Sequence, residues 1–284
     1  MINSLHSKAI ISILVCIGLS CQLSAQQQLS RDQVLQKVVE RATQNEQERK
    51  AYGYDLNMII HWLNDEGSIR KSEVREYRTN WDDETPQLQL VSINHKQLTE
   101  KQLREEQKNR EELQKTMPNG SKGQSFPSEF PFTWTELKSK YDFKMESADA
   151  NAPYVIGFKP KDIDLPERCR MEKILNHLTG KIWVDDNFNI LKLEGHLANK
   201  VSFGFGLAKV KQLDVVYNQK VFQGIAVPDS INLNFRVQAL VFYSDRREIS
   251  TSFVNYRSKS EMARELEEQS GINREAEVLP ARPH

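Results

Sequence analysis

The clearest pattern in the chain is an alternation of apolar and polar residues over positions 231–243, which read INLNFRVQALVFY. Every odd-numbered position is apolar, whereas the even-numbered positions begin with Asn232, Asn234 and Arg236. Because successive side chains of a strand point to opposite faces of a sheet, this pattern predicts a long strand with one apolar and one polar face. An apolar face of that length needs a cover, and what covers it is the central question about function.

Two more segments repeat the period-two pattern. In residues 52–62 the even-numbered positions are apolar or aromatic, which predicts a half-buried strand with an aromatic-rich inner face. Residues 201–207 alternate large apolar side chains with small residues, and glycine inside a strand marks a bulge or a bend. With the weaker segments included, the chain has about nine to eleven strands and no regular alternation of strands with helices. This order predicts an α+β fold built on an antiparallel sheet.

Two segments begin with the pattern of a helix capping box. Ser30 and Gln33 precede apolar residues that recur at helical spacing, which predicts a first helix with one apolar stripe. Thr99 and Gln102 repeat the capping-box pattern at the start of residues 99–116. That second helix is dense in charged residues, so we expect it to be exposed to solvent.

A short third helix is predicted over residues 166–178, with Pro166 in its first turn and Gly180 as its stop signal. The preceding segment, residues 117–132, has the proline, glycine and serine content of a flexible loop. A loop of this length is uncommon in a compact domain and is a candidate flap.

Clusters of polar residues place the later turns. Residues 185–189 (DDNFN) predict a hairpin turn; oxygen-bearing side chains alternate there as in a calcium loop, but the glycine and the distant glutamate of such a loop are missing. Separate strands are predicted near residues 209–217 and 221–227, before the long strand that starts at Ile231. The charged residues 244–247 (SDRR) predict the turn into the last strand.

The first 25 residues have the organisation of a secretory signal peptide. Lys8 precedes an apolar core at residues 9–19, which is too short to cross a bilayer, and residues 23–25 (LSA) offer a cleavage site. We therefore expect a periplasmic or secreted protein. The alternative is a membrane-anchored lipoprotein modified at Cys21, although Gly18 stands where a bacterial lipobox usually has a large aliphatic residue.

Cleavage of this leader would leave one cysteine, Cys169, which cannot form an internal disulfide. At the other end, residues 258–284 are charged and then proline-containing, which predicts a tail that is partly helical and then disordered. A single folded domain over residues 29–257 lies between the leader and the tail.

Composition and motifs argue against catalysis and against nucleic-acid binding. The chain has 39 Lys+Arg and 39 Asp+Glu, so it has no net positive charge to attract a polyanion. Its histidines lack the spacing of metal ligands, and the sequence contains neither a nucleophile elbow nor a phosphate-binding glycine loop. We expect no enzymatic activity, no metal and no cofactor, and beyond the leader no apolar run is long enough for a transmembrane segment.

Three short segments carry a family resemblance: residues 94–99 (NHKQLT), 180–185 (GKIWVD) and 253–256 (FVNY). Together with the order of the elements, they resemble the LolA/LolB-like periplasmic lipoprotein-sorting proteins, and in particular an uncharacterised group of exported bacterial proteins related to them. The resemblance covers roughly residues 29–256. It implies a strongly curved antiparallel sheet, a half-barrel that wraps a few helices around an apolar cavity, and it brings no catalytic residues.

The apolar faces of the strands are the remaining candidate for a functional site. One hypothesis is a carrier or sensor that binds a lipid or a lipoprotein acyl chain in the half-barrel. The other is a non-catalytic interaction module of the cell envelope, with a half-barrel that its own helices fill. The strands offer more large apolar side chains than two amphipathic helices cover, which makes a ligand cavity plausible. The candidate lining residues are Tyr52, Tyr54, Leu56, Met58, Ile60, Trp62, Phe203, Phe205, Leu207, Leu233, Phe235, Val237 and Val241.

Overall fold

The computed structural model describes residues 29–82, 85–115, 138–148, 152–163, 165–167, 170–204, 207–239, 243–262 and 264–265. The chain divides into two compact units, residues 1–36 and 37–284. Helix α2 (Arg31–Arg49) begins in the first unit, and the whole sheet belongs to the second. The predicted leader, the loop at 117–132, Cys169 and the end of the tail lie outside the described residues.

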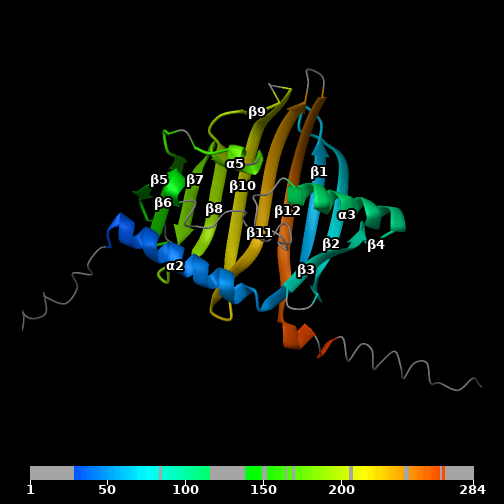
Figure 1. Ribbon diagram of the computed structural model, residues 1–284, viewed down its shortest axis with the longest axis horizontal. Helices are drawn as coiled ribbons and strands as arrows, with labels where there is room; N and C mark the ends of the chain where they lie inside the picture. The colour runs from blue at the N-terminus through cyan, green and yellow to red at the C-terminus, as the bar shows by residue number, and fades with distance from the viewer. Residues whose placement is uncertain are drawn as a thin grey trace, which may run out of the picture. The chain divides into compact units, whose positions relative to one another are not determined.

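The second unit is built on one open sheet in which all the described strand pairs are antiparallel, which confirms the α+β half-barrel (Figure 1). The described residues form twelve strands, one more than the upper limit of the predicted range. The order across the sheet is β4-β3-β2-β1-β12-β11-β10-β8-β7-β6-β5, with β9 paired to β10. The strands are β1 (Tyr52–Leu63), β2 (Ile69–Asp82), β3 (Thr85–Ile93), β4 (Lys96–Gln97), β5 (Tyr141–Glu146), β6 (Tyr154–Pro160), β7 (Leu178–Val184), β8 (Ile190–Leu197), β9 (Val201–Phe203), β10 (Ala208–Phe222), β11 (Ile225–Ala239) and β12 (Tyr243–Ser258).

Irregularities in register bend the long strands. Strand β1 has one between Gly53 and Asp55, where it pairs with β12, and β10 has one between Asn218 and Gln219. A bulge adds a residue on one side of a pair, which bends the strand and increases its twist. Such irregularities in several neighbouring pairs explain how a wide sheet becomes curved.

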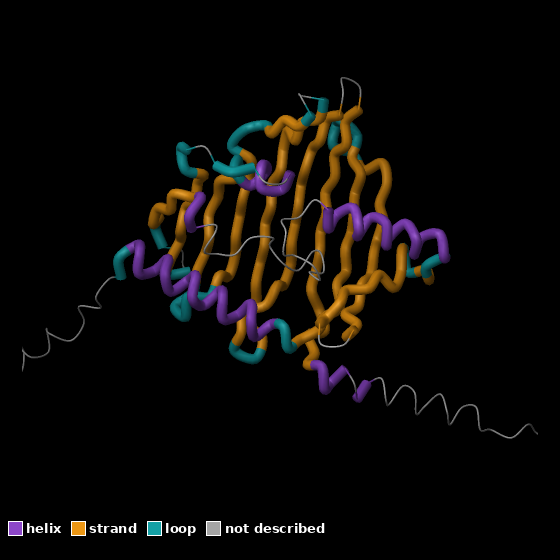
Figure 2. The backbone as a smooth tube through the Cα atoms, in the orientation of Figure 1, coloured by secondary structure: helices purple, strands orange, loops and turns teal. Residues whose placement is uncertain are grey.

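Both predicted capping boxes form. The backbone N–H of Ser30 donates to the Gln33 side-chain oxygen at 2.8 Å, and the Gln33 N–H donates to the Ser30 hydroxyl at 3.3 Å. Thr99 and Gln102 make the same reciprocal pair, at 2.9 and 3.3 Å, at the start of α3 (Glu100–Lys115). Figure 2 colours these helices purple and the strands orange. No helix within the described ranges is both long and apolar enough to cross a bilayer.

The predicted third helix over residues 166–178 is wrong in extent. Helix α5 (Arg170–Leu175) is shorter, and both Leu178 and Gly180 belong to β7. Gly180 is therefore not a helix stop signal. An added Cβ at this position would lie 1.8 Å from the carbonyl oxygen of Glu194, so glycine is required by the close approach of β7 to β8.

The strand boundaries predicted around the opening pattern also need correction. Residues 209–217 and 221–227 are not two strands, because β10 runs without interruption and turns at Gln223 and Gly224. Both turn residues have positive φ, 49° and 85°, as a tight hairpin turn requires. The long strand ends at Ala239, and residues 244–247 are not a turn but the start of β12.

The 185–189 hairpin turn is confirmed by its hydrogen bonds. Oδ1 of Asp185 accepts from the backbone N–H groups of Asn187 and Asn189, at 2.9 and 2.7 Å. Oδ1 of Asn189 in turn accepts from Arg41 at 2.8 Å and from Asn45 at 3.0 Å, which fixes α2 to this turn. These oxygens bind the protein's own donors, as expected of a structural turn.

Candidate functional site

The apolar sides of the predicted strands join into one continuous face. The register places Ile60 of β1 opposite Ile249 of β12, Ile249 opposite Leu233 of β11, and Leu233 opposite Val215 of β10. Residues directly opposite each other in antiparallel strands point to the same side of the sheet. The two patterns first seen in residues 52–62 and 231–243 therefore lie on one face.

Burial changes along this face. On the apolar side of β1, Leu56 is 0% exposed, Met58 is 8% exposed and Ile60 is 6% exposed. These three residues pack with Tyr77 and Phe253 in the main core cluster. Most apolar side chains along the middle of β10 and β11 are only half-buried, although Val210, opposite Val237, is 8% exposed. We call this half-buried part the central apolar face; its residues are Leu213, Val215, Leu233, Phe235, Val237 and Ile249.

The described helices contact this face on either side of its centre. Arg75, which lies opposite Met58 on the apolar side of β2, makes an ion pair with Glu106 of α3 at 3.4 Å. At the other side of the sheet, the Tyr141 hydroxyl donates to the carbonyl oxygen of Leu175 in α5 at 2.5 Å. Figure 1 shows α5 in front of the upper part of β10 and α3 on the β12 side, with β11 between the two helices.

Charged side chains border the upper end of the central apolar face, as it is drawn in Figure 1. Trp62 lies between two cations, with the Lys71 ammonium 4.2 Å and the Arg247 guanidinium 5.3 Å from its ring centroid. Arg247 is also 5.9 Å from the Phe235 ring, and it forms a two-point contact with Asp245 at 3.0 and 2.5 Å. The central apolar face thus ends in charged groups of the kind that bind the polar head of an amphipathic molecule.

A buried carboxylate stabilises this charged border. Glu73 accepts hydrogen bonds from Lys71 at 3.0 Å and from Arg75 at 2.7 Å. Burial by itself would raise the pKa of Glu73, but the two cationic donors outweigh it, so the pKa of this carboxyl lies below its usual value. Glu73 therefore stays ionised and holds both cations in place.

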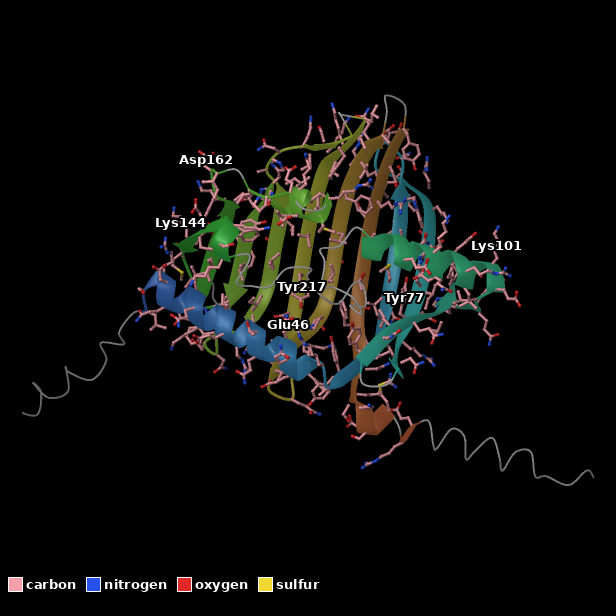
Figure 3. All side chains as sticks on the ribbon, viewed as in Figure 1. Glu46, Tyr77, Lys101, Lys144, Asp162 and Tyr217 are labelled. Carbon is pink, nitrogen blue, oxygen red and sulfur yellow. The ribbon has the colours of Figure 1, made fainter. Side chains whose placement is uncertain are left out.

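Tyrosine side chains border the lower end of the central apolar face. Burial raises the pKa of Tyr256 far above its usual range, and its hydroxyl donates to the carbonyl oxygen of Pro228 at 2.6 Å. Burial also raises the pKa of Tyr217, against the opposing charge of Arg49 at the end of α2 (Figure 3). The ring of Tyr54 packs on Tyr256 with centroids 5.5 Å apart. These neutral phenols form a wall of aromatic rings rather than a charged site.

The predicted lining residues fall into separate groups. Leu56, Met58 and Ile60 belong to the filled core, and Tyr54 and Trp62 pack against it. Leu233, Phe235 and Val237 lie on the central apolar face. The other described candidates lie elsewhere: Tyr52 packs against Phe222 at the lower end, Phe203 is half-buried on β9, and Leu207 is exposed in the turn before β10. Phe205 and Val241 lie outside the described residues.

Sequence reasoning missed the β10 and β12 members of the face. Leu213, Val215 and Tyr217 occupy every second position, but Val216 between the last two is also apolar, so the period-two signal was weak. Ile249 follows charged residues that were interpreted as a turn. Their strand position became evident only from the pairing of Arg247 with Phe235 across β12 and β11.

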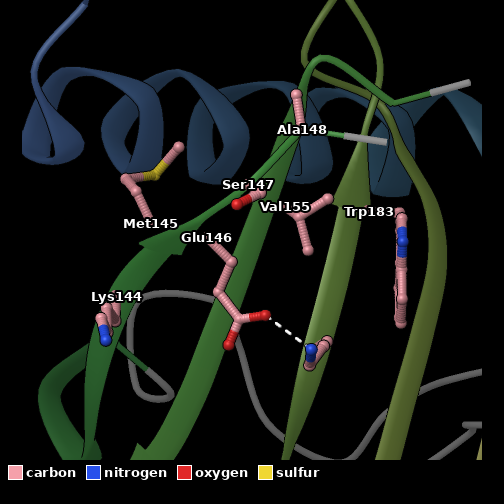
Figure 4. Close-up of a pocket in the computed structure, with 8 residues that line it drawn as sticks. Lys144, Met145, Glu146, Ser147, Ala148, Val155 and Trp183 are labelled. Carbon is pink, nitrogen blue, oxygen red and sulfur yellow. Dashed lines mark ion pairs between the residues drawn. The ribbon is translucent and has the colours of Figure 1, made fainter. Parts of the chain in front are cut away.

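A separate pocket of about 790 Å³ lies at the β5–β7 edge (Figure 4). Its lining is mainly polar, and an ion pair between Lys181 and Glu146, 2.6 Å long, crosses it. The register Glu146–Val155–Trp183 places it on the side of the sheet opposite the apolar face. Within the described ranges no group of three or more His, Cys, Asp or Glu side chains is arranged to hold a metal ion, here or elsewhere.

Comparison with protein-family models finds no match, and neither does comparison with curated proteins. Among solved structures, the chain matches an inferred outer membrane lipoprotein-sorting protein domain from Vibrio parahaemolyticus, at 12% identity and a TM-score of 0.33. It also matches a DUF1329 family protein from Desulfovibrio piger, at 10% identity and a TM-score of 0.28. Each match covers 79% of this chain and 93% of the other chain. Likenesses this distant transfer no function.

Proposed function

We propose that this protein binds the acyl chain of a lipid or lipoprotein on the central apolar face, as a carrier or sensor in the cell envelope. One observation carries the proposal: the apolar face is buried at Leu56, Met58 and Ile60 of β1, whereas the residues of the central apolar face are only half-buried. Half-buried aliphatic side chains still gain free energy when a ligand removes them from water. Each CH₂ group that a ligand buries contributes about 0.8 kcal/mol, so a chain of about a dozen carbons needs little polar recognition.

The borders of the face suit an amphipathic ligand. Aliphatic side chains dominate the centre and would contact the hydrocarbon. At the upper end, Lys71 and Arg247 offer positive charge for an acidic or phosphate-bearing head, while Asp245 and Glu73 keep these cations oriented. At the lower end, the aromatic wall at Tyr217 and Tyr256 would limit the length of the chain that is bound.

The proposal includes export. The pattern of residues 1–25 supports cleavage near Ala25 and release into the periplasm or the medium, and lipid modification at Cys21 is the alternative. Either route brings the protein to membranes that contain acylated molecules. No catalytic step is proposed.

Native mass spectrometry of protein purified from a bacterial periplasm tests the proposal, together with titration of a fluorescent fatty acid. We expect a co-purifying lipid and saturable uptake. Leu233→Asp places a carboxylate between the aliphatic side chains of Val215 and Ile249 and should reduce uptake at least about tenfold, because burying an unpaired carboxylate is costly.

Ile59→Asp is the matched control, because Ile59 alternates with Ile60 and so points to the opposite face, where it is 39% exposed. This variant should bind like the wild type. A ligand-free mass without fatty-acid uptake by the wild-type protein would refute the proposal and favour an interaction module with a self-filled core.

A further inference from the structure

Exposed apolar side chains are concentrated at one end of the strands. Ile69 beside the β1–β2 turn is 58% exposed, Leu207 before β10 is 60% exposed, and Tyr243 at the start of β12 is 58% exposed. Ile163, on the loop that follows β6, is 63% exposed at the same end but further along the sheet. At the opposite end of these strands, Val221 is the one large apolar side chain among the described residues with comparable exposure, 55%.

The register shows that three hairpin ends are neighbours. Leu63 lies opposite both Ile69 of β2 and Arg246 of β12. Ala239 of β11 lies opposite both Tyr243 and Ala208, the residue that follows Leu207. These ends project together at the top of Figure 1. We call them the hairpin rim, consisting of residues 64–71, 200–204, 207–211, 236–239 and 243–247.

The hairpin rim is basic, although the whole chain has equal numbers of basic and acidic residues. Its charged residues are Arg70, Lys71, Lys200, Lys209, Lys211, Arg236, Arg246 and Arg247 against Asp65, Glu66 and Asp245, eight basic against three acidic. Arg70, Lys200 and Lys209 are exposed, and none of the three makes an ion pair with any described residue. Their charge is available to an external partner.

We propose that the hairpin rim docks on the surface of a membrane that contains anionic lipids. Aliphatic side chains and a tyrosine would enter the interfacial layer while neighbouring lysines and arginines contact lipid phosphates, the combination that peripheral proteins use. The apolar side chains stand on separate hairpins and do not line one concave surface. That arrangement fits a soft, fluid surface better than the shaped groove of a protein partner. The rim shares Lys71, Arg247 and Val237 with the proposed ligand site, so the tests below change rim residues that lie outside that site.

Sedimentation with vesicles tests the docking surface. The purified exported protein is mixed with vesicles of phosphatidylcholine alone or with about one third phosphatidylglycerol. We expect binding to the anionic vesicles that high salt weakens, and little binding to the neutral ones. Lys200→Glu combined with Lys209→Glu should lower the binding constant about tenfold or more, since each basic residue near such a surface contributes several-fold.

The matched control is Lys101→Glu combined with Lys108→Glu on α3, which changes the net charge equally on exposed positions away from the rim. It should bind nearly as well as the wild type. An equal loss in both double variants would show that net charge alone drives binding and would overturn the rim assignment. All variants share the same N-terminus, and urea midpoints check that each one is folded.

Insertion of the hairpin rim into the membrane is tested with a tryptophan placed at one end of the strands or at the other. Tyr243→Trp places a tryptophan on the hairpin rim, and Val221→Trp places one at the opposite end of the same strands. Brominated anionic lipids should quench the fluorescence of Tyr243→Trp more than that of the wild type, and should leave Val221→Trp at the wild-type level. Equal quenching in the two variants would overturn the proposal. Failure of the wild-type protein to bind any of the vesicles would also overturn the proposal. An acidic protein would then be the partner that fits the basic rim.

Discussion

The part of the apolar face around β1, which includes Phe253 of β12, and the central apolar face have the same chemistry and different surroundings. Phe253, paired with Leu56 of β1, is 0% exposed, whereas Phe235, on neighbouring β11, is half-buried. Both lie on the apolar side of the same sheet. The comparison shows that alternation determines which side of a strand is apolar, while burial depends on what packs above each strand.

The largest expected effect comes from truncating these two phenylalanines. Phe253→Ala should lower the free energy of unfolding by about 3–5 kcal/mol, because it leaves a cavity in a filled core. Phe235→Ala should cost less, about 1–2 kcal/mol, since part of that side chain is already exposed to water. Urea denaturation of the ligand-free proteins measures both changes. Equal losses in the two variants would mean that the faces are equally packed, which removes the basis for a ligand site.

Substitutions that add volume should also distinguish the filled core from the central apolar face. Ile60→Phe has to force extra atoms into the core and should cost about 1–3 kcal/mol. Val215→Phe, in the same row across the sheet, should leave stability nearly unchanged and reduce fatty-acid uptake. Thermal unfolding and fluorescent titration of both variants provide the measurement. A strongly destabilised Val215→Phe variant would contradict the incomplete packing that we infer for the central apolar face.

The smallest effect concerns the charged border. The pKa of Glu73 in the folded protein is below the value of 4.5 of an unperturbed glutamate. Its contribution to stability is therefore complete above pH 4.5 and is lost as the pH falls through the folded pKa. Glu73→Gln should cost at most about 1 kcal/mol at neutral pH and should lose stability less steeply in acid. Urea midpoints measured from pH 7 to pH 3 give the two slopes, and parallel slopes would count against ionisation of Glu73 in the folded state.

Periodicity predicted the strands well where one face is uniformly apolar. Strand β1 was expected over residues 52–62 and extends to Leu63. The start of β12 was missed, because Asp245 and Arg247 are charged residues on the apolar side of a strand. Each satisfies the other by a two-point contact, and Arg247 covers Trp62, so the strand tolerates them. Such compensation depends on a partner from β1, which no local pattern reveals.

The site was less predictable than the fold. Leu56 and Leu233 have equivalent positions in their alternating patterns, yet one is in the core and the other is half-buried. The difference follows from their neighbours: Leu56 packs in a cluster with Tyr77 of β2 and Phe253 of β12, whereas Leu233 is not a member of that cluster. These neighbours come from strands distant in the sequence, and no local pattern identifies which strands will pair.

The position of β1 between β2 and β12 has a consequence for the order of folding. Asn255 donates to Asp55, 200 residues earlier in the chain, so the last strand completes the surroundings of the first. Until β12 arrives, β1 is an unpaired sheet edge with Leu56 and Ile60 lacking their neighbours. Contacts this distant in sequence fold slowly, because a long loop must close before they form. If the chain is threaded through a secretion channel from its N-terminus, the sheet cannot close early, and the polypeptide stays in a conformation that the channel can accept until its final strand has crossed.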